Sequence, residues 1–274
     1  MYRFAALIAA FVGLIGLADA SAQDVEFITY KDISYGDHGR QKLDIYAPAT
    51  IEPGTPIVVF FHGGAWRYGE KEDLSDQGKS FAGSGVIFVT ANYRLFPDAV
   101  FPEFVEDAAA AVTLTLDTFN ANDGEPHPLF LSGWSAGAYN AALLAYDERF
   151  LAQHGIRADI VKGLIGLSGP YEGGLCAGVR CGHIFPEEAR SDWNVAGHVE
   201  SDEPPALLIV AERDPYVPAR HHEDLIDAIR RAGGRAALHV LPSDSHFATQ
   251  AAMLQAEGEV RALIREFMAG VISD

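Results

Sequence analysis

The sequence contains few cysteines and few basic residues. Its two cysteines, Cys176 and Cys181, leave no paired C-x-x-C motif of the kind found in zinc sites. Lysine and arginine number 20 against 38 aspartates and glutamates, so the formal net charge is -18 at pH 7. Nucleic acid and anionic membrane surfaces would repel this charge and are excluded as partners. Anionic substrates are disfavoured as well, unless a local arginine offsets the field.

Motifs for cofactors are also missing. There is no H-E-x-x-H, the ten histidines have no ligand spacing, and no G-x-G-x-x-G follows the first expected strand. We therefore expect no metal and no other cofactor. Beyond the first residues, no apolar run is long enough to cross a bilayer, so we expect no membrane insertion of the mature chain.

The first 22 residues resemble a secretory signal peptide. Arg3 provides a positive start, residues 4–17 are apolar, and small-residue cleavage signals end at Ala20 and at Ala22. An uncleaved anchor is the alternative, although the apolar stretch is shorter than a membrane span. The sequence predicts an exported protein, periplasmic or secreted.

Residues 23–274 show apolar runs that alternate with helical patterns. This alternation predicts one α/β domain with a mostly parallel sheet of about eight strands and helices on both faces. The expected strands are 25–30, 42–47, 57–61, 86–91, 129–131, 161–167, 206–211 and 237–241, of which the first two form an antiparallel edge. The expected helices are 74–83, 103–119, 138–146, 220–232 and 249–271.

The segment 169–200 interrupts this rhythm. It is rich in glycine, proline, aromatic residues and histidine, and it is too long for an ordinary connection. We expect a lid-like insertion that forms a wall of the substrate pocket; a surface loop is the alternative. Export would allow its cysteines, Cys176 and Cys181, to form a disulfide, with two free thiols as the other possibility.

A serine nucleophile is indicated by Gly133-Trp134-Ser135-Ala136-Gly137, which has the G-x-S-x-G pattern of a strand-to-helix elbow. A serine hydroxyl needs a base, and the base needs an orienting acid. Asp214 and His246 follow two later strands in the required order, so all three side chains reach one edge of the sheet. The rival histidines are placed less well, because His221 and His222 fall on a helix expected at the surface.

The segment from His62 to Trp66 directly follows the strand 57–61. Its glycines, Gly63 and Gly64, leave backbone N–H groups bare, and with the N–H of Ala136 they would form an oxyanion hole. We expect His62 to brace this loop by hydrogen bonding. Three aromatic residues beside these segments are expected to line the substrate pocket, with a place in the core as the alternative; they are Trp66, Trp134 and Tyr171.

These motifs resemble those of the α/β-hydrolase serine esterases over essentially all of residues 23–274. The resemblance also includes Asp44 to Pro48, Asn92 to Leu95, Phe101-Pro102, Glu106-Asp107 and Val217-Pro218. It is strongest to the small carboxylesterases that include arylformamidases and feruloyl-esterase-like enzymes, which are related to hormone-sensitive-lipase-type esterases. In that last branch the loop usually has HGGG and the elbow GDSAG, whereas this chain has Ala65-Trp66 and Trp134.

The resemblance implies an α/β-hydrolase fold without a cofactor. The expected function is hydrolysis of a small-molecule carboxylic ester through an acyl-enzyme, with Ser135, His246 and Asp214 as the catalytic residues. An arylformamidase activity with the same residues is an alternative. A more remote one is a ligand-binding protein of this fold without enzymatic activity.

Overall fold

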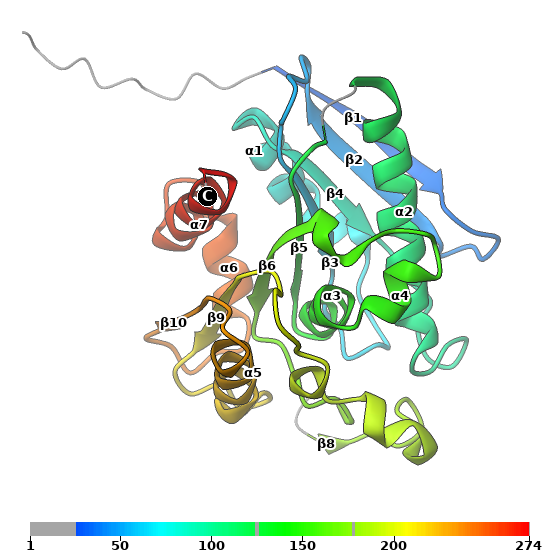
Figure 1. The fold of residues 1–274 in the computed structure, drawn as a ribbon, viewed down its shortest axis with the longest axis vertical. Helices are drawn as coiled ribbons and strands as arrows, with labels where there is room; N and C mark the ends of the chain where they lie inside the picture. The colour runs from blue at the N-terminus through cyan, green and yellow to red at the C-terminus, as the bar shows by residue number, and fades with distance from the viewer. Residues whose placement is uncertain (1–25, 124–125, 177–178, 274) are drawn as a thin grey trace, which may run out of the picture.

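The computed structural model describes residues 26–123, 126–176 and 179–273, so the predicted signal peptide lies outside the described residues. One eight-stranded sheet forms its centre, in the order β1-β2-β4-β3-β5-β6-β9-β10 (Figure 1). The bounds are β1 Phe27–Ser34, β2 Lys42–Pro48, β3 Ile57–Phe61, β4 Ile87–Ala91, β5 Leu129–Trp134, β6 Val161–Leu167, β9 Ala206–Ala211 and β10 Ala236–Leu241. Strand β2 runs antiparallel to both β1 and β4, and the pairs from β4 to β10 are parallel. The predicted mostly parallel sheet is confirmed.

Helices cover both faces of the sheet. On one face the core includes residues from α2 (Glu103–Asp123), α3 (Ala136–Tyr146), α4 (Glu148–Ala152) and α5 (Arg220–Arg231). On the other face it includes residues from α1 (Ser75–Gly83), α6 (Ala248–Leu254) and α7 (Glu259–Ser273). Strand β3 is apolar throughout because Val59 points into the first core and Val58 and Phe60 into the second.

The last predicted helix, 249–271, is corrected by the structure. This segment consists of two helices. The backbone is extended at Gln255, directly after α6, and the second helix, α7, begins at Glu259. Gly258 donates its N–H to the carbonyl of Gln255 in the turn between them. Glycine has a low helix propensity, which fits its place in the break. No helix in the described part of the chain is long and apolar enough to span a membrane.

The insertion 169–200 lies beyond the carboxyl end of β6. It contains a two-stranded hairpin, β7 (Leu175–Cys176) and β8 (Val179–Arg180), and the 3-10 turns η3 (Glu187–Asp192) and η4 (Val195–Gly197). Two further 3-10 turns, η1 (Lys71–Leu74) and η2 (Ala158–Ile160), complete the described elements. The insertion therefore sits at the edge of the sheet where the parallel strands end (Figure 1).

Candidate active site

Ser135 stands at the sharp turn between β5 and α3. Its backbone is strained, with φ 54° and ψ -120°, a conformation that non-glycine residues rarely adopt. Gly133 and Gly137, on either side of Ser135, leave no room for a side chain. A Cβ on Gly137 would lie 2.0 Å from the carbonyl oxygen of Phe61, and one on Gly133 would lie 2.3 Å from the backbone of Gly137. Close packing of strand against helix therefore holds the serine at the sheet edge.

Ser135 is the first member of a hydrogen-bonded chain of three side chains. Its Oγ lies 2.9 Å from Nε2 of His246, and Nδ1 of His246 lies 2.6 Å from Oδ2 of Asp214. The three residues come from the loops after β5, β9 and β10. The structure thus brings together the serine, acid and histidine that the sequence indicated, over separations of 111 and 32 residues.

Asp214 is held as a carboxylate. Its Oδ1 accepts the backbone N–H groups of Tyr216 at 2.9 Å and of Val217 at 3.0 Å. Burial alone would raise the pKa of Asp214, but the hydrogen bond and charge of His246 and these two N–H groups bring the pKa below its ordinary value. An ionised Asp214 accepts a hydrogen bond from the Nδ1–H of His246, which leaves Nε2 free to accept one from the hydroxyl of Ser135.

The loop after β3 lies against the same edge. A Cβ on Gly63 would fall 2.3 Å from the ring of Trp134, and one on Gly64, where φ is 118°, would fall 2.1 Å from the carbonyl oxygen of Tyr68. Only glycine fits at both positions. Ala136 is the first residue of α3, where a helix leaves its N–H groups without an intrahelical acceptor. These are the N–H groups that the sequence predicts for an oxyanion hole.

His62 braces this loop from behind. Its Nδ1 donates to the carbonyl of Gly63 at 2.7 Å, its ring stacks on Tyr93 at 4.5 Å, and Tyr93 Oη donates to the carbonyl of His62 at 2.8 Å. Burial lowers the pKa of His62 to about 4, so the ring is neutral at pH 7. The bracing place expected for His62 is the one that it occupies.

Arg40 is a part of this loop's support that the sequence did not indicate. Its guanidinium donates to the carbonyls of Tyr93 at 2.9 Å and Gly69 at 2.8 Å, and it pairs with Glu70 at 2.6 Å. Arg40 precedes β2 in a stretch without a recognisable motif, and its partners follow 29 to 53 residues later. No local signal in the sequence could have identified it.

The three predicted pocket aromatics have different places. Trp134 lies beside the site, with its ring 5.1 Å from that of His246. Trp66 is 1% exposed, donates its Nε1 to Asn140 and packs at 4.8 Å against Phe185, so it occupies the core, the alternative to a pocket wall. Tyr171 is likewise 1% exposed and packs in the core.

His221 and His222 lie on α5, a helix with one exposed face as expected, but their side chains point inward. Both are buried, at 1% and 0% exposure, on the inner side of α5. The ring of His222 packs edge-on against Tyr171 at 5.4 Å, and burial lowers its pKa to about 3. The pattern of polar and apolar residues in α5 did not reveal this burial, because a histidine side chain can lie on either the buried or the exposed face of a helix.

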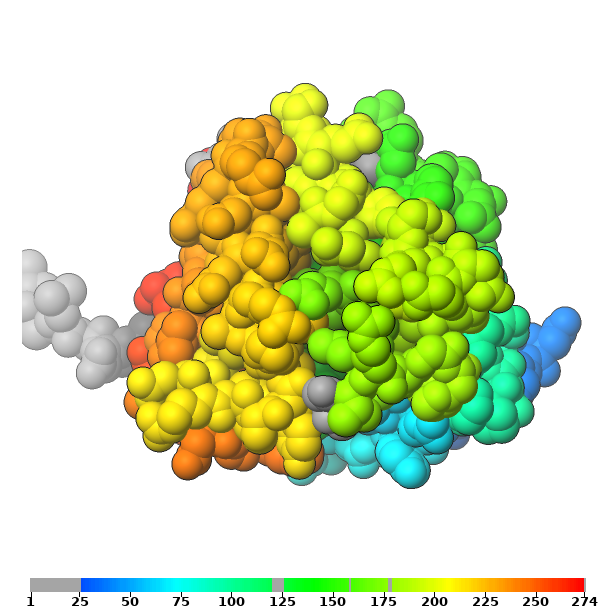
Figure 2. Space-filling model, turned by 90° about the horizontal axis from the view of Figure 1, so that it is seen from below, coloured from blue at the N-terminus to red at the C-terminus, as the bar shows by residue number. Residues whose placement is uncertain are grey.

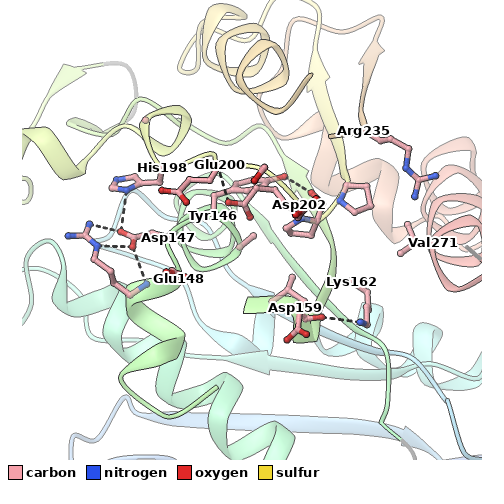
Figure 3. A pocket seen from close by; sticks show the side chains of 18 residues that line it. Tyr146, Asp147, Glu148, Asp159, Lys162, His198, Glu200, Asp202, Arg235 and Val271 are labelled. Carbon is pink, nitrogen blue, oxygen red and sulfur yellow. Dashed lines mark hydrogen bonds and ion pairs between the residues drawn. The ribbon is translucent and has the colours of Figure 1, made fainter. Parts of the chain in front are cut away.

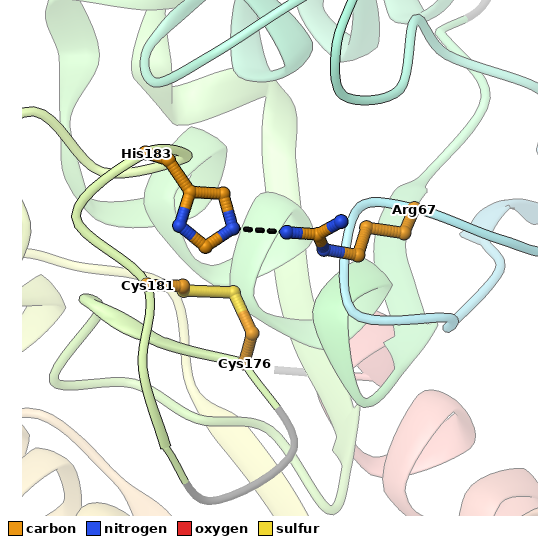
Figure 4. Close-up of a disulfide and its surroundings, with 4 residues drawn as sticks. All are labelled: Arg67, Cys176, Cys181 and His183. Carbon is orange, nitrogen blue, oxygen red and sulfur yellow. Dashed lines mark hydrogen bonds between the residues drawn. A yellow bond between two sulfur atoms is a disulfide. The ribbon is translucent and has the colours of Figure 1, made fainter.

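The insertion is fastened to the loop after β3. A disulfide joins Cys176 and Cys181, and near it His183 is hydrogen-bonded to Arg67 (Figure 4). The carbonyl of Ile184 accepts the N–H of Phe101 at 2.8 Å. Viewed onto the carboxyl ends of the strands, the surface is hollowed between the insertion and the loops after β9 and β10, with the region of α3 visible between them (Figure 2).

A cavity of about 610 Å³ lies elsewhere (Figure 3). It is lined by Val161, Pro205 and Arg235, which stand at the beginnings of β6, β9 and β10. It is therefore at the amino ends of the strands, on the opposite edge from Ser135. Several carboxylates border it, and in the described ranges no group of histidine, cysteine, aspartate and glutamate is arranged to hold a metal ion.

The fold resembles those of solved esterases. A truncated carbohydrate esterase from gut microbiota aligns with a TM-score of 0.75 and 16% identity over 92% of this chain and 98% of that one. A hyperthermophilic esterase from the archaeon Pyrobaculum calidifontis aligns with a TM-score of 0.69 and 22% identity, over 90% of this chain and 85% of that one. At these identities the likeness establishes the fold, and the predicted α/β-hydrolase fold is confirmed.

Sequence comparisons agree. Isoprenylcysteine alpha-carbonyl methylesterase ICME from Arabidopsis thaliana is 29% identical over 238 residues, 79% of this chain and 56% of that protein. Kynurenine formamidase from Danio rerio is 28% identical over 144 residues, 53% of this chain and 47% of that one. The chain spans from about a third to just over half the length of the methylesterase relatives.

Family models cover most of the domain. The BD-FAE model matches residues 43–162, and the model described as the prolyl oligopeptidase family matches residues 103–272, more than half of the chain. The predicted resemblance to α/β-hydrolase serine esterases is confirmed. The chain belongs to the prolyl oligopeptidase family of α/β-hydrolases.

Proposed function

We propose that this protein is a serine hydrolase that cleaves carboxylic esters through an acyl-enzyme. The observation that carries the proposal is the continuous hydrogen-bonded chain from Ser135 through His246 to Asp214. A serine hydroxyl is a poor nucleophile unless a base in hydrogen-bond reach takes its proton, and this geometry supplies that base and its orienting acid. The methylesterase relatives support an ester as the substrate.

In the first step, Oγ of Ser135 bonds to the ester carbonyl carbon while Nε2 of His246 takes the hydroxyl proton. The N–H groups of Gly63, Gly64 and Ala136 receive the negative charge on the carbonyl oxygen, and each such donor is typically worth about 2.7–4 kcal/mol in the transition state. The bond to the alcohol then breaks, and His246 gives its proton to the leaving oxygen. Asp214 stabilises the imidazolium throughout.

In the second step, water takes the place of the alcohol. His246 removes a proton from the water, whose oxygen bonds to the acyl carbon, and the same N–H groups stabilise the oxyanion. The bond to Oγ breaks, His246 returns the proton to Ser135, and the carboxylic acid leaves. No cofactor enters either half of this cycle.

Hydrolysis of an aryl formamide is a second candidate. The kynurenine formamidase relatives favour it, because they match over about half of this chain. The same residues would perform it, with an amine in place of the alcohol as leaving group. A direct comparison of kcat/KM for p-nitrophenyl acetate and for an aryl formamide decides between them. We expect the ester to be the faster substrate, and a faster formamide would reverse the assignment.

The first experiment is replacement of the nucleophile. Ser135→Ala should lower kcat for p-nitrophenyl esters roughly a millionfold, as in other serine triads, and should abolish labelling by a fluorophosphonate. Ser201→Ala is the matched control, since Ser201 is exposed and borders the cavity at the opposite strand ends. Substantial ester turnover by pure, folded Ser135→Ala protein would contradict the proposal, as would a wild-type protein that resists labelling.

We further propose that the protein is exported and that its leader is removed near Ala20 or Ala22. The disulfide between Cys176 and Cys181 supports this, because such bonds persist in oxidising compartments. Mass spectrometry of the protein isolated from the periplasm or medium of its expressing cells should show a chain that begins at Ser21 or Gln23. An intact chain retained in the cytoplasm would contradict export.

A further inference from the structure

A second cavity, of about 450 Å³, opens between the insertion and the start of α5. Residues of the insertion form most of the cavity lining, and Arg220, the first residue of α5, forms the rest. These segments border the hollow seen at the carboxyl ends of the strands (Figure 2). The volume is within the usual range for sites that hold small ligands, roughly 300–1,000 Å³. We call it the arginine cavity.

The arginine cavity has the opposite charge balance to the whole chain. Its charged lining residues are Arg180, Arg190 and Arg220 and a single carboxylate, Glu172. The complete sequence has 20 basic against 38 acidic residues. A cluster of guanidinium groups at this point is what would offset the repulsion that a chain of net charge -18 exerts on an anionic ligand.

The three arginines differ in how far nearby carboxylates neutralise their charges. Arg220 pairs with Glu172 through two contacts, at 2.7 and 3.3 Å, so their charges cancel. Arg190 is paired at 2.6 Å with Glu187, whose side chain is 67% exposed. Arg180 has no ion-pair partner among the described residues, and it is exposed at the end of β8. One cationic group therefore remains available to a ligand.

A further donor beside the arginines lacks an acceptor. Trp193 lines the cavity and is 7% exposed, and its indole N–H has no hydrogen-bond partner in the part of the chain that the structure describes. Buried donors are rarely left without an acceptor, because burial removes their bond to water. The guanidinium of Arg190 lies 5.8 Å from the centre of the Trp193 ring. The indole nitrogen is itself buried, so the guanidinium groups are the exposed donors of this wall.

The cavity is connected to the catalytic elements through short contacts. Tyr139 lies one turn into α3 and donates its N–H to the carbonyl of Ser135, while its Oη donates to the carbonyl of Trp193 at 2.8 Å. On the other side, Arg220 follows Asp214 by six residues. Tyr139 therefore joins the wall of the arginine cavity to the helix that begins directly after Ser135.

We propose that the arginine cavity binds a free carboxylate on the substrate, so that the protein prefers esters that carry a second, ionised carboxyl group. A carboxylate presents two acceptor oxygens in a plane, which matches the paired donors of a guanidinium. The proposal rests on ester hydrolysis at Ser135 and adds the chemical class of the substrate.

The test compares matched esters that differ only in charge. One pair carries the carboxylate on the acyl side, as the 4-nitrophenyl hemiester of adipic acid against its methyl-capped form. The other carries it on the alcohol side, as 4-acetoxybenzoate against its methyl ester. For the wild type we expect kcat/KM of the anionic member of one pair to exceed that of the neutral member about tenfold, mainly through KM, and to lose this preference at high salt.

Arg180→Gln should lower the ratio of anionic to neutral kcat/KM about tenfold, because it removes one charge-assisted contact. Arg231→Gln is the matched control: it changes the same charge on the exposed side of α5, away from the cavity, and should leave the ratio unchanged. A wild-type ratio of one or less for both pairs would overturn the proposal, as would a ratio that Arg180→Gln does not change. Failure to hydrolyse the neutral esters would instead contradict the proposed function.

Discussion

Asp214 is the residue whose role is most sharply set by its contacts. Its two oxygens are fully engaged, one by His246 and the other by two backbone N–H groups. An asparagine of the same shape would present an amide N–H to at least one of these donors. The imidazole of His246 would then be held in the tautomer with its proton on Nε2, which cannot accept from Ser135.

Asp214→Asn should therefore lower kcat for p-nitrophenyl acetate by about 10⁴-fold, the loss known for this change in another serine triad, with the fold retained. Steady-state kinetics with circular dichroism provides the measurement. Asp224→Asn, an exposed change on α5, is the control. A loss of less than tenfold would argue against a catalytic role for Asp214.

Individual side chains differ in how far the sequence reveals them. Ser135, Asp214 and His246 could be identified because each follows a strand, and parallel strands deliver their ends to one edge. For Trp66 and Tyr171 the sequence left the pocket wall and the core open, since their burial depends on packing partners distant in the chain, such as Phe185 and His222. Proximity in sequence to a catalytic residue does not decide between these two places.

Among the elements, the strands were the easiest to predict. Buried parallel strands are short and apolar throughout, and the predicted bounds of β3, β6 and β9 agree with those observed. The break between α6 and α7 was missed, because a single glycine is tolerated within many helices. The path of the insertion was beyond prediction, since its conformation depends on the disulfide and on contacts such as that between His183 and Arg67.

The loop that contains Gly63 and Gly64 depends on support from a distant element. Arg40 donates hydrogen bonds to the carbonyls of Gly69 and Tyr93. Hydrogen bonds that involve a charged group contribute about 1.5–3 kcal/mol each to stability. Arg40→Gln should loosen the loop and so misplace the oxyanion donors. We expect kcat to fall about tenfold or more while KM changes less, because the donors act on the transition state.

Arg157→Gln is the control for this variant, since Arg157 is exposed and pairs only with the nearby Asp159 in the described chain. Kinetics and thermal unfolding of both proteins would be measured together. A fall in Tm for Arg40→Gln with unchanged kcat would show that Arg40 stabilises the fold and does not position the loop.

The folded protein should lose stability in acid, because two histidines are buried in it as neutral rings. His62 and His222 are buried as neutral rings, with pKa values of about 4 and about 3 against an ordinary 6.5. As the pH falls below 6.5, the unfolded chain binds protons that the folded chain does not. The free energy of unfolding therefore decreases from pH 6.5 towards pH 4, by about 1.4 kcal/mol per pH unit for each histidine.

Urea unfolding at pH 6.5, 5.5 and 4.5 tests this prediction against His222→Phe, which removes one of the two groups. The variant should show a pH dependence that is shallower by about 1.4 kcal/mol per unit, whatever its stability at neutral pH. Parallel curves for the two proteins would mean that His222 titrates in the folded protein as it does in the unfolded chain.

The hydrogen bond between Ser135 and His246 spans 111 residues of sequence. A ribosome that has synthesised β5, α3, β9 and the loop after β9 has made the nucleophile and its acid but not the base. The proposed hydrolysis therefore cannot begin until the loop after β10 has been added to the growing chain. Within the proposed function, the order of synthesis thus keeps the nucleophile without its base until β10 and the loop after it have been made.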